Sequence, residues 1–281
     1  MTNQFAAISL TALLIGGVTA CVPALAQSAG TIVELETPLA ASPPLQGILR
    51  QPSAKGPSPA AILLHGCNGN WRHLDAGWGE RIARWGYVTL TVDSFGPRGL
   101  HNTCSSGAPV DMVRDAYRAL DFLVRQPSVD QANVAVVGFS QGGWLALTSV
   151  ERGIIEQISP NKFRAAIAFY PPCRAFKGNM TVPTLILVGE LDDWTPASEC
   201  RYMVDGRDDF GISRQKGAGI PVKLIVYPDA YHAFDIAALG DGVQYFGHHL
   251  AYNREAADRS ADALRDFLNA TIGAGDKEPA R

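Results

Sequence analysis

The residues best suited to chemistry lie at 138–142, where Gly-Phe-Ser-Gln-Gly follows an apolar, β-branched run. Ala146 and Leu147 continue with helical character, so the pattern predicts a strand, a sharp turn carrying Ser140, and a helix. Glycines two residues before and after the serine remove side chains that would clash in such a turn. The positive end of the helix would face Ser140, where negative charge develops during acyl transfer. We therefore predict a nucleophilic serine.

A serine hydroxyl is a poor nucleophile near neutral pH, so it needs a base that is in turn oriented by an acid. The apolar run 185–188 leads to Asp192, with Asp193 beside it as an alternative acid, and the run 223–227 leads to His232. Sites in parallel α/β sheets lie just beyond the carboxyl ends of strands, where all these residues are expected. We predict Ser140 as nucleophile, His232 as general base and Asp192 or Asp193 as the orienting acid.

Strands and helices that alternate along the chain would position these residues. The expected strands cover 31–36, 45–50, 60–64, 87–92, 132–137, 163–170, 184–188 and 222–227, and the expected helices cover 75–84, 110–124 and 256–268 besides the one after Ser140. Several strands are apolar on both faces, which predicts an α/β fold with a mostly parallel central sheet and helices on both faces. The stretch 151–162 after the serine helix is too short for a large lid domain.

These motifs resemble the dienelactone hydrolase family of the α/β-hydrolases. The resemblance rests on the serine turn, on Gly189-x-x-Asp192 with Pro196 after it, and on Tyr231-His232-Ala233-Phe234, and it covers about residues 45–270. It implies an α/β-hydrolase fold and a hydrolase with a Ser-Asp-His triad of Ser140, Asp192 and His232, because the family spacing favours Asp192 over Asp193. The best-known members carry a cysteine nucleophile, whereas this chain has Ser140. The difference favours ordinary esters or lactones over dienelactone as the substrate.

Other residues are candidates for binding. The oxyanion hole is expected to use the backbone N–H groups of Gln141 and of Cys67, which follows His65-Gly66 at a strand end. Arg98 would hold a substrate carboxylate, or alternatively form an ion pair with Asp93 or another loop acid. Aromatic side chains are candidates for the pocket, with packing in the core as the alternative: Trp71, Trp144, Trp194 and Tyr231.

The N-terminal segment, residues 1–26, has no charged side chain and ends in Ala24-Leu25-Ala26, which predicts a secretory signal peptide. One alternative is a lipoprotein signal that ends before a lipidated Cys21, and another is an uncleaved membrane anchor. The catalytic domain is expected at 27–272, with a flexible tail at 273–281. We expect an exported protein, periplasmic or secreted, that meets a membrane only if Cys21 is lipidated.

Four cysteines remain after residue 26, and an even count in an exported chain suggests disulfides. Four cysteines allow three pairings, with free or buried thiols as the alternative. Positions on neighbouring strand ends favour Cys67–Cys104 and Cys173–Cys200.

The composition narrows the function further. The chain has 281 residues, 47% hydrophobic and 18% charged, with a net charge of −3 and no basic patch, which fits a soluble enzyme and excludes a nucleic-acid partner. No short His/Cys ligand spacing and no lysine-bearing phosphate loop occurs, so we expect neither a metal nor a cofactor. We predict a serine hydrolase that cleaves small esters or lactones through an acyl-enzyme. The alternatives are an acyltransferase, a small peptidase, and a non-catalytic binding protein on a hydrolase scaffold.

Overall fold

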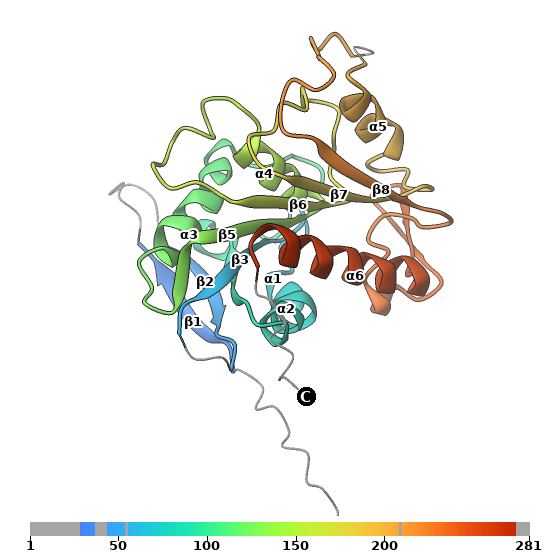
Figure 1. Ribbon diagram of the computed structural model, residues 1–281. Helices are drawn as coiled ribbons and strands as arrows, with labels where there is room; N and C mark the ends of the chain where they lie inside the picture. The colour runs from blue at the N-terminus through green and yellow to red at the C-terminus, as the bar shows by residue number, and fades with distance from the viewer. Residues whose placement is uncertain (1–28, 37–43, 54–55, 208–209, 274–281) are drawn as a thin grey trace, which may run out of the picture.

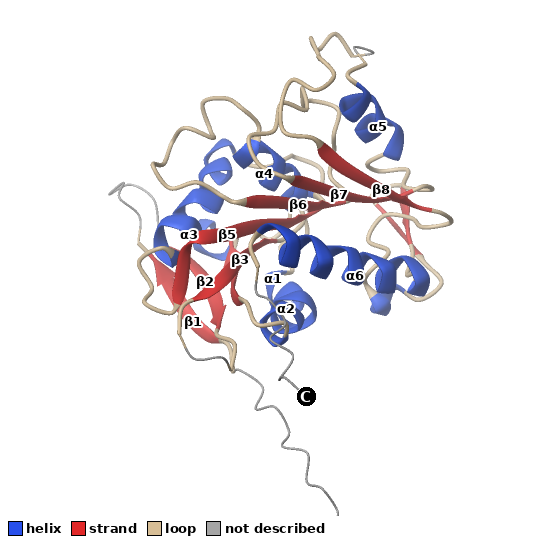
Figure 2. Cartoon of the chain, viewed as in Figure 1, coloured by secondary structure: helices blue, strands red, loops and turns tan. Residues whose placement is uncertain are grey.

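The centre of the computed structural model is an eight-stranded sheet in the order β1-β2-β4-β3-β5-β6-β7-β8 (Figures 1 and 2). Six neighbouring strands run parallel to one another, namely β4, β3, β5, β6, β7 and β8. Strand β2 pairs antiparallel with both β1 and β4. The strands are β1 Thr31–Leu35, β2 Leu45–Arg50, β3 Ser58–Leu64, β4 Val88–Asp93, β5 Val129–Phe139, β6 Ala165–Phe169, β7 Thr184–Gly189 and β8 Val222–Tyr227.

The structure describes residues 29–36, 44–53, 56–207 and 210–273. The expected signal peptide at 1–26, with Cys21, lies outside the described residues, and so do residues 274–281 of the expected tail. None of the helices within the described ranges is long and apolar enough to cross a membrane.

Helices cover both faces of the sheet (Figure 2). One face carries α1 Trp71–Leu74, the π-helical turn Asp75–Gly79, α2 Glu80–Arg84 and α6 Arg254–Thr271; the other carries α3 Asp115–Leu123, α4 Gln141–Val150 and α5 Ala197–Asp205. Strands β6 and β7 are buried at every position, which is why their sequences are apolar with little alternation. Strand β4 is buried as well, although Thr89 and Thr91 alternate with its apolar residues. The expected fold, a mostly parallel sheet without a large lid, is therefore confirmed.

The differences from expectation lie in the short elements. The helix expected at 110–124 begins as a 3-10 turn, Val110–Arg114, before α3, and the helix expected at 75–84 begins at Trp71 and passes through the π-helical turn. The sequence did not indicate α5, nor the hairpin of β9 Val243–Tyr245 and β10 His248–Leu250. Three-residue strands are too short to show a periodic pattern.

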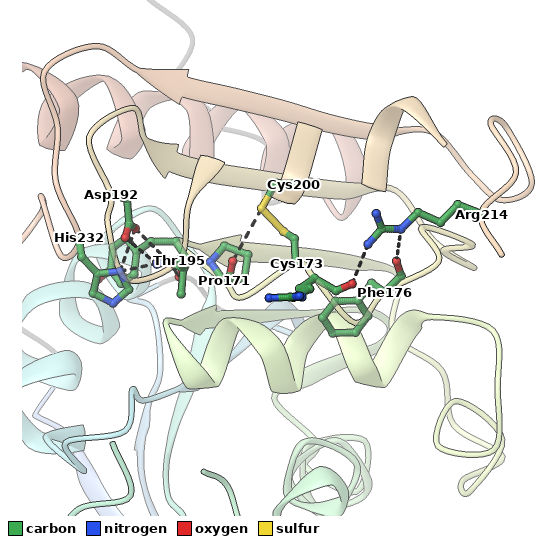
Figure 3. Close-up of a disulfide and its surroundings, with 10 residues drawn as sticks. Pro171, Cys173, Phe176, Asp192, Thr195, Cys200, Arg214 and His232 are labelled. Carbon is green, nitrogen blue, oxygen red and sulfur yellow. Dashed lines mark hydrogen bonds and ion pairs between the residues drawn. A yellow bond between two sulfur atoms is a disulfide. The ribbon is translucent and has the colours of Figure 1, made fainter. Parts of the chain in front are cut away.

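Two disulfides lie near the carboxyl ends of the strands, one between two loops and one between a loop and α5. They join Cys67 to Cys104 and Cys173 to Cys200, which confirms the favoured pairing. Cys173 and Cys200 are fully buried, and Figure 3 shows their bond between the Asp192–His232 pair and Arg214. Arg214 holds the segment that includes Cys173, because its guanidinium donates to the carbonyls of Phe176 at 2.8 Å and Arg174 at 2.7 Å.

Candidate active site

Ser140 lies in a strained turn between β5 and α4. Its backbone has φ 54° and ψ −116°, a region that a residue with a side chain seldom adopts. Two close approaches hold the turn. A Cβ at Gly138 would lie 1.9 Å from the Gly142 carbonyl oxygen, and a Cβ at Gly142 would lie 2.1 Å from the Leu64 carbonyl oxygen. Only glycine fits at these two positions, so both glycines of the motif are steric requirements of the turn.

His232 follows β8 and reaches the serine from the neighbouring strand ends. Its Nε2 lies 3.0 Å from Ser140 Oγ, and its Nδ1 lies 2.8 Å from Asp192 Oδ2. Both His232 and Asp192 are buried. When Nδ1 donates its proton to the carboxylate, Nε2 carries the lone pair and accepts from the serine hydroxyl. The structure thus brings together the three residues expected as nucleophile, base and acid.

The Asp192 carboxylate is fixed by its own loop. Its Oδ1 accepts from the backbone N–H groups of Trp194 at 2.9 Å and Thr195 at 2.8 Å. The Thr195 hydroxyl lies 2.9 Å from Asp192 Oδ2, 3.1 Å from His232 Nδ1 and 3.0 Å from the Tyr170 carbonyl oxygen (Figure 3). Thr195 was not expected from the sequence, and its hydroxyl contacts both Asp192 and His232.

Asp193, the alternative acid, points elsewhere. Its side chain is about half exposed, and its carboxylate lies 3.6 Å from His248 Nδ1 and 3.3 Å from the His249 backbone nitrogen. The structure therefore places Asp192, and not Asp193, against His232.

Thr103 bonds to both residues expected to supply the oxyanion donors, Cys67 and Gln141. Gln141 is the first residue of α4, so its N–H is not used within the helix. Thr103 donates from its backbone to the Cys67 carbonyl at 2.8 Å and from its hydroxyl to Gln141 Oε1 at 2.9 Å. The neighbouring Cys104 is bonded to Cys67. One loop thus braces both sides of the expected oxyanion hole.

His65 supports the loop that carries Gly66 and Cys67. Its Nδ1 donates to the Gly66 carbonyl at 2.8 Å, while its Nε2 accepts from the Ser94 backbone at 3.2 Å. Burial lowers the pKa of His65, which keeps the ring neutral and suits the acceptor role of Nε2.

The structure does not bring Arg98 to Ser140. Its guanidinium forms ion pairs of 2.8 Å with both Asp115 on α3 and Asp111, and donates to the Ser94 carbonyl at 2.7 Å. The substrate-binding prediction for Arg98 is corrected accordingly. The alternative, an ion pair with an acid, is what forms, although the partners are not Asp93. The Arg98 guanidinium instead pairs with the buried carboxylate of Asp115 on α3.

The expected aromatic pocket residues divide in two groups. Trp144 and Trp194 line space beside Ser140. Trp71 instead packs beneath the Arg72 guanidinium, 4.4 Å from its ring centroid, and the Tyr231 ring lies 4.4 Å from that of His249. Neither Trp71 nor Tyr231 lines the space at Ser140, so their expected pocket role is corrected to packing.

A carboxylate that the sequence did not single out lies behind the histidine. Asp235 accepts from the Tyr170 hydroxyl and from Trp78 Nε1, both at 2.7 Å. The Tyr170 ring in turn lies 4.7 Å from the His232 ring. Burial raises the pKa of the Asp235 carboxyl, and it also raises that of the Tyr170 hydroxyl. The only sequence signal was an acid three residues after the histidine.

The arrangement suits nucleophilic acyl transfer. A strained, outward-facing hydroxyl lies within hydrogen-bond reach of a base that a buried carboxylate orients, which is the geometry of an activated nucleophile. Within the ranges that the structure describes, no cluster of three or more His, Cys, Asp or Glu side chains is suited to hold a metal ion.

Comparisons with known proteins bear on the family and on the fold. Residues 45–272 match the model of the dienelactone hydrolase family. A dienelactone hydrolase-like promiscuous phosphotriesterase from metagenomic libraries superposes with a TM-score of 0.66 at 20% identity, over 87% of this chain and 100% of that one. Esterase 2 of Thermogutta terrifontis, solved phosphoramylated by tabun, gives 0.61 at 16% identity, over 88% and 96%.

A curated relative matches over a shorter stretch. Acylamino-acid-releasing enzyme 1 of Oryza sativa subsp. japonica is 30% identical over 122 residues, which is 41% of this chain. The match spans only 15% of that enzyme's length.

Proposed function

The chain belongs to the dienelactone hydrolase family, and from that premise we propose that it is a serine hydrolase that cleaves carboxylic esters or lactones through an acyl-enzyme. The observation that carries the proposal is the pair of hydrogen bonds made by His232, 3.0 Å to Ser140 Oγ and 2.8 Å to Asp192 Oδ2. The esterases among the structural neighbours support the fold that such chemistry requires.

In the first half of the reaction, Ser140 Oγ attacks the ester carbonyl carbon while His232 Nε2 takes the hydroxyl proton. The oxyanion of the tetrahedral intermediate accepts from the Gln141 and Cys67 N–H groups, a contribution typically worth about 3–4 kcal/mol per donor. His232 then gives its proton to the departing alkoxide oxygen. The products are the alcohol and an acyl group esterified to Ser140.

In the second half, His232 removes a proton from a water molecule, which attacks the acyl carbonyl. The second tetrahedral intermediate collapses, Ser140 recovers its proton from His232, and the acid leaves. Asp192 stabilises the imidazolium that forms in each half, and Thr195 keeps that carboxylate in place.

The first test is the intact mass of the protein before and after a fluorophosphonate probe. We expect one adduct, absent from Ser140→Ala, whose turnover of p-nitrophenyl acetate falls by about five orders of magnitude or more. Turnover retained by a folded Ser140→Ala variant would refute the proposal.

The same measurement discriminates the alternative functions. A folded protein without an adduct would favour a non-catalytic scaffold. An adduct together with transfer of acetyl to an added alcohol in preference to water would favour an acyltransferase. An adduct with cleavage of acylated peptides but not of esters would favour a peptidase, the activity suggested by the name of the rice relative.

We further propose that the protein is exported to an oxidising compartment, periplasmic or extracellular. The support is its two disulfides, which form and persist in such compartments. The mass of the exported protein distinguishes cleavage after Ala26 from lipidation at Cys21. An unprocessed mass in purified cytoplasmic protein, with none exported, would contradict it.

A further inference from the structure

Two pockets open at Ser140. The first, which we call the Ala175 pocket, has a volume of about 460 Å³ and lies between the Cys67–Cys104 disulfide and the segment that includes Pro172 and Ala175. The second, the Ala238 pocket, has a volume of about 480 Å³ and lies between α1 and the loop after His232 that includes Ala238. Both are large enough for a small-molecule group.

Three residues line both pockets: Ser140, Cys67 and Trp194. A substrate whose carbonyl carbon lies at Ser140 Oγ therefore has space in two directions. An ester has two substituents on its carbonyl carbon, the acyl chain and the alkoxy group. The question is which of them enters which pocket.

The position of the base decides the assignment. His232 lines the Ala238 pocket, together with Ala233 and Ile236 that follow it, and it does not line the Ala175 pocket. Gln141, an expected oxyanion donor, lines the Ala175 pocket. The general acid must lie within hydrogen-bond reach of the oxygen that it protonates. The alkoxy oxygen therefore leaves on the side of the Ala238 pocket.

We infer that the Ala238 pocket binds the alcohol part of the ester and the Ala175 pocket binds the acyl part, an inference that rests on the proposed function. The alcohol pocket is lined by apolar side chains from segments far apart in the sequence: Leu74, Trp78, Ile236, Leu239 and Leu250. The preferred substrates are esters of apolar alcohols of aromatic size.

The charged groups in the alcohol pocket are engaged within the protein. The Asp235 carboxyl accepts from Trp78 and Tyr170, and the Arg81 guanidinium lies 5.0 Å above the Trp78 ring. Polar side chains also line this pocket, among them Asn68, Asn70 and His73. Apolar and aromatic contact with the alcohol is worth about 25 cal/mol per Å² of apolar surface removed from water.

The acyl pocket has two opposite walls, and a disulfide fixes each of them. The segment with Pro172, Arg174 and Ala175 is held by the Cys173–Cys200 disulfide and by the bonds from Arg214 to the carbonyls of Arg174 and Phe176 (Figure 3). The opposite wall carries the Cys67–Cys104 disulfide. Fixed walls make this pocket selective for the size of the acyl group.

The two exposed alanines provide matched variants, since Ala238→Trp fills the alcohol pocket and Ala175→Trp fills the acyl pocket. We expect Ala238→Trp to lower the ratio of kcat/KM for benzyl acetate over methyl acetate about tenfold or more. Ala175→Trp should lower the ratio for methyl phenylacetate over methyl acetate by a similar factor.

Pre-steady-state kinetics add an independent readout. The alcohol has left before deacylation begins, so the effect of Ala238→Trp should be confined to acylation, whereas Ala175→Trp should slow both phases for the phenylacetyl group. Adduct formation with a small fluorophosphonate verifies that each variant retains a working Ser140.

The outcomes separate the two proposals. Adducts at Ser140 combined with the reverse pattern, in which Ala238→Trp discriminates acyl size and Ala175→Trp discriminates alcohol size, would overturn the pocket assignment alone. Adducts with no change in either ratio would overturn it too. Wild-type protein without an adduct would overturn the proposed function, and the assignment with it.

Discussion

One imidazole ring determines whether Ser140 is activated, because only the tautomer with a bare Nε2 accepts the hydroxyl proton. The buried Asp192 carboxylate selects that tautomer by accepting from Nδ1 at 2.8 Å. Thr195 and two backbone N–H groups leave the carboxylate no freedom to turn away. In the proposed reaction, activation of the serine therefore depends on an acid that never touches the substrate.

Asp192→Asn should lower kcat for p-nitrophenyl acetate by about four orders of magnitude, because the new amide favours the wrong tautomer of His232. The matched control is Asp193→Asn, whose carboxylate faces His248 and His249, and kcat should stay within about twofold of wild type. Rates measured at pH 7 test both variants. A large loss in Asp193→Asn with little in Asp192→Asn would reassign the acid.

Asp235 makes stability depend on pH. Burial raises its pKa, so the folded protein binds this proton more tightly than the unfolded chain. The resulting stabilisation is full below the ordinary carboxyl pKa of about 3.9 and is lost as pH rises through the raised value. In Asp235→Asn, the amide oxygen accepts from Trp78 and the amide nitrogen donates to the Tyr170 oxygen, so both bonds persist without a charge.

We expect the Tm of Asp235→Asn to gain on that of the wild type as pH rises from 4 to 7. Thermal melts across this range measure the difference, which cancels contributions from the other titrating groups. Parallel curves for the two proteins would show that the carboxyl carries no such pH dependence.

At the scale of elements, Arg98 fastens the loop after β4 to α3. Asp115 is fully buried, and Arg98 provides its 2.8 Å ion pair. Arg98→Met should lower the free energy of unfolding by about 3–5 kcal/mol, because it leaves a buried carboxyl without this partner, and the double variant Arg98→Met/Asp115→Leu should recover much of the loss. Denaturant melts measure both. A raised KM for esters with unchanged stability would instead restore a substrate role for Arg98.

The sheet and the reacting residues were predictable because local chemistry dictates them. Strands buried on both faces are mostly apolar, and the turn at Ser140 admits only glycine at 138 and 142. The candidate acids and the base followed from their places at strand ends, and the family motif favoured Asp192 over Asp193. These signals are contained in a few neighbouring residues.

The surroundings of the site were not predictable from local sequence. Trp78 and Asp235 meet although 157 residues separate them, and no pattern announces such a contact. Whether Arg98 is free to bind a substrate depended on the carboxylates near it. Asp115 on the neighbouring helix provides a buried one that pairs with Arg98. Pockets arise from tertiary packing, so their residues show no periodicity of their own.

At the scale of the whole molecule, we expect both disulfides to stabilise the fold but only Cys67–Cys104 to affect kcat strongly. Each should contribute about 2–4 kcal/mol of stability through constraint of the unfolded chain. Cys67→Ala/Cys104→Ala should also lower kcat for methyl acetate about tenfold or more, because the loop that carries the expected oxyanion donor, the Cys67 N–H, loses its cross-link. Cys173→Ala/Cys200→Ala should lower Tm with a much smaller effect on kcat. Melts and steady-state rates test the pair, and equal losses of kcat would contradict the distinction.

The residues of the candidate active site are also separated along the chain, so they are synthesised at different times. Ser140 and the residues of the oxyanion loop are synthesised first, and the base follows 92 residues later, beyond the last strand of the large sheet. The loop that carries it is held by the N-terminus of α6, where Asn253 donates to the carbonyls of Phe234 and Asp229. A nascent chain therefore exposes its serine only as an ordinary hydroxyl. The hydrogen bond that would activate Ser140 forms only once the segment with His232 has folded.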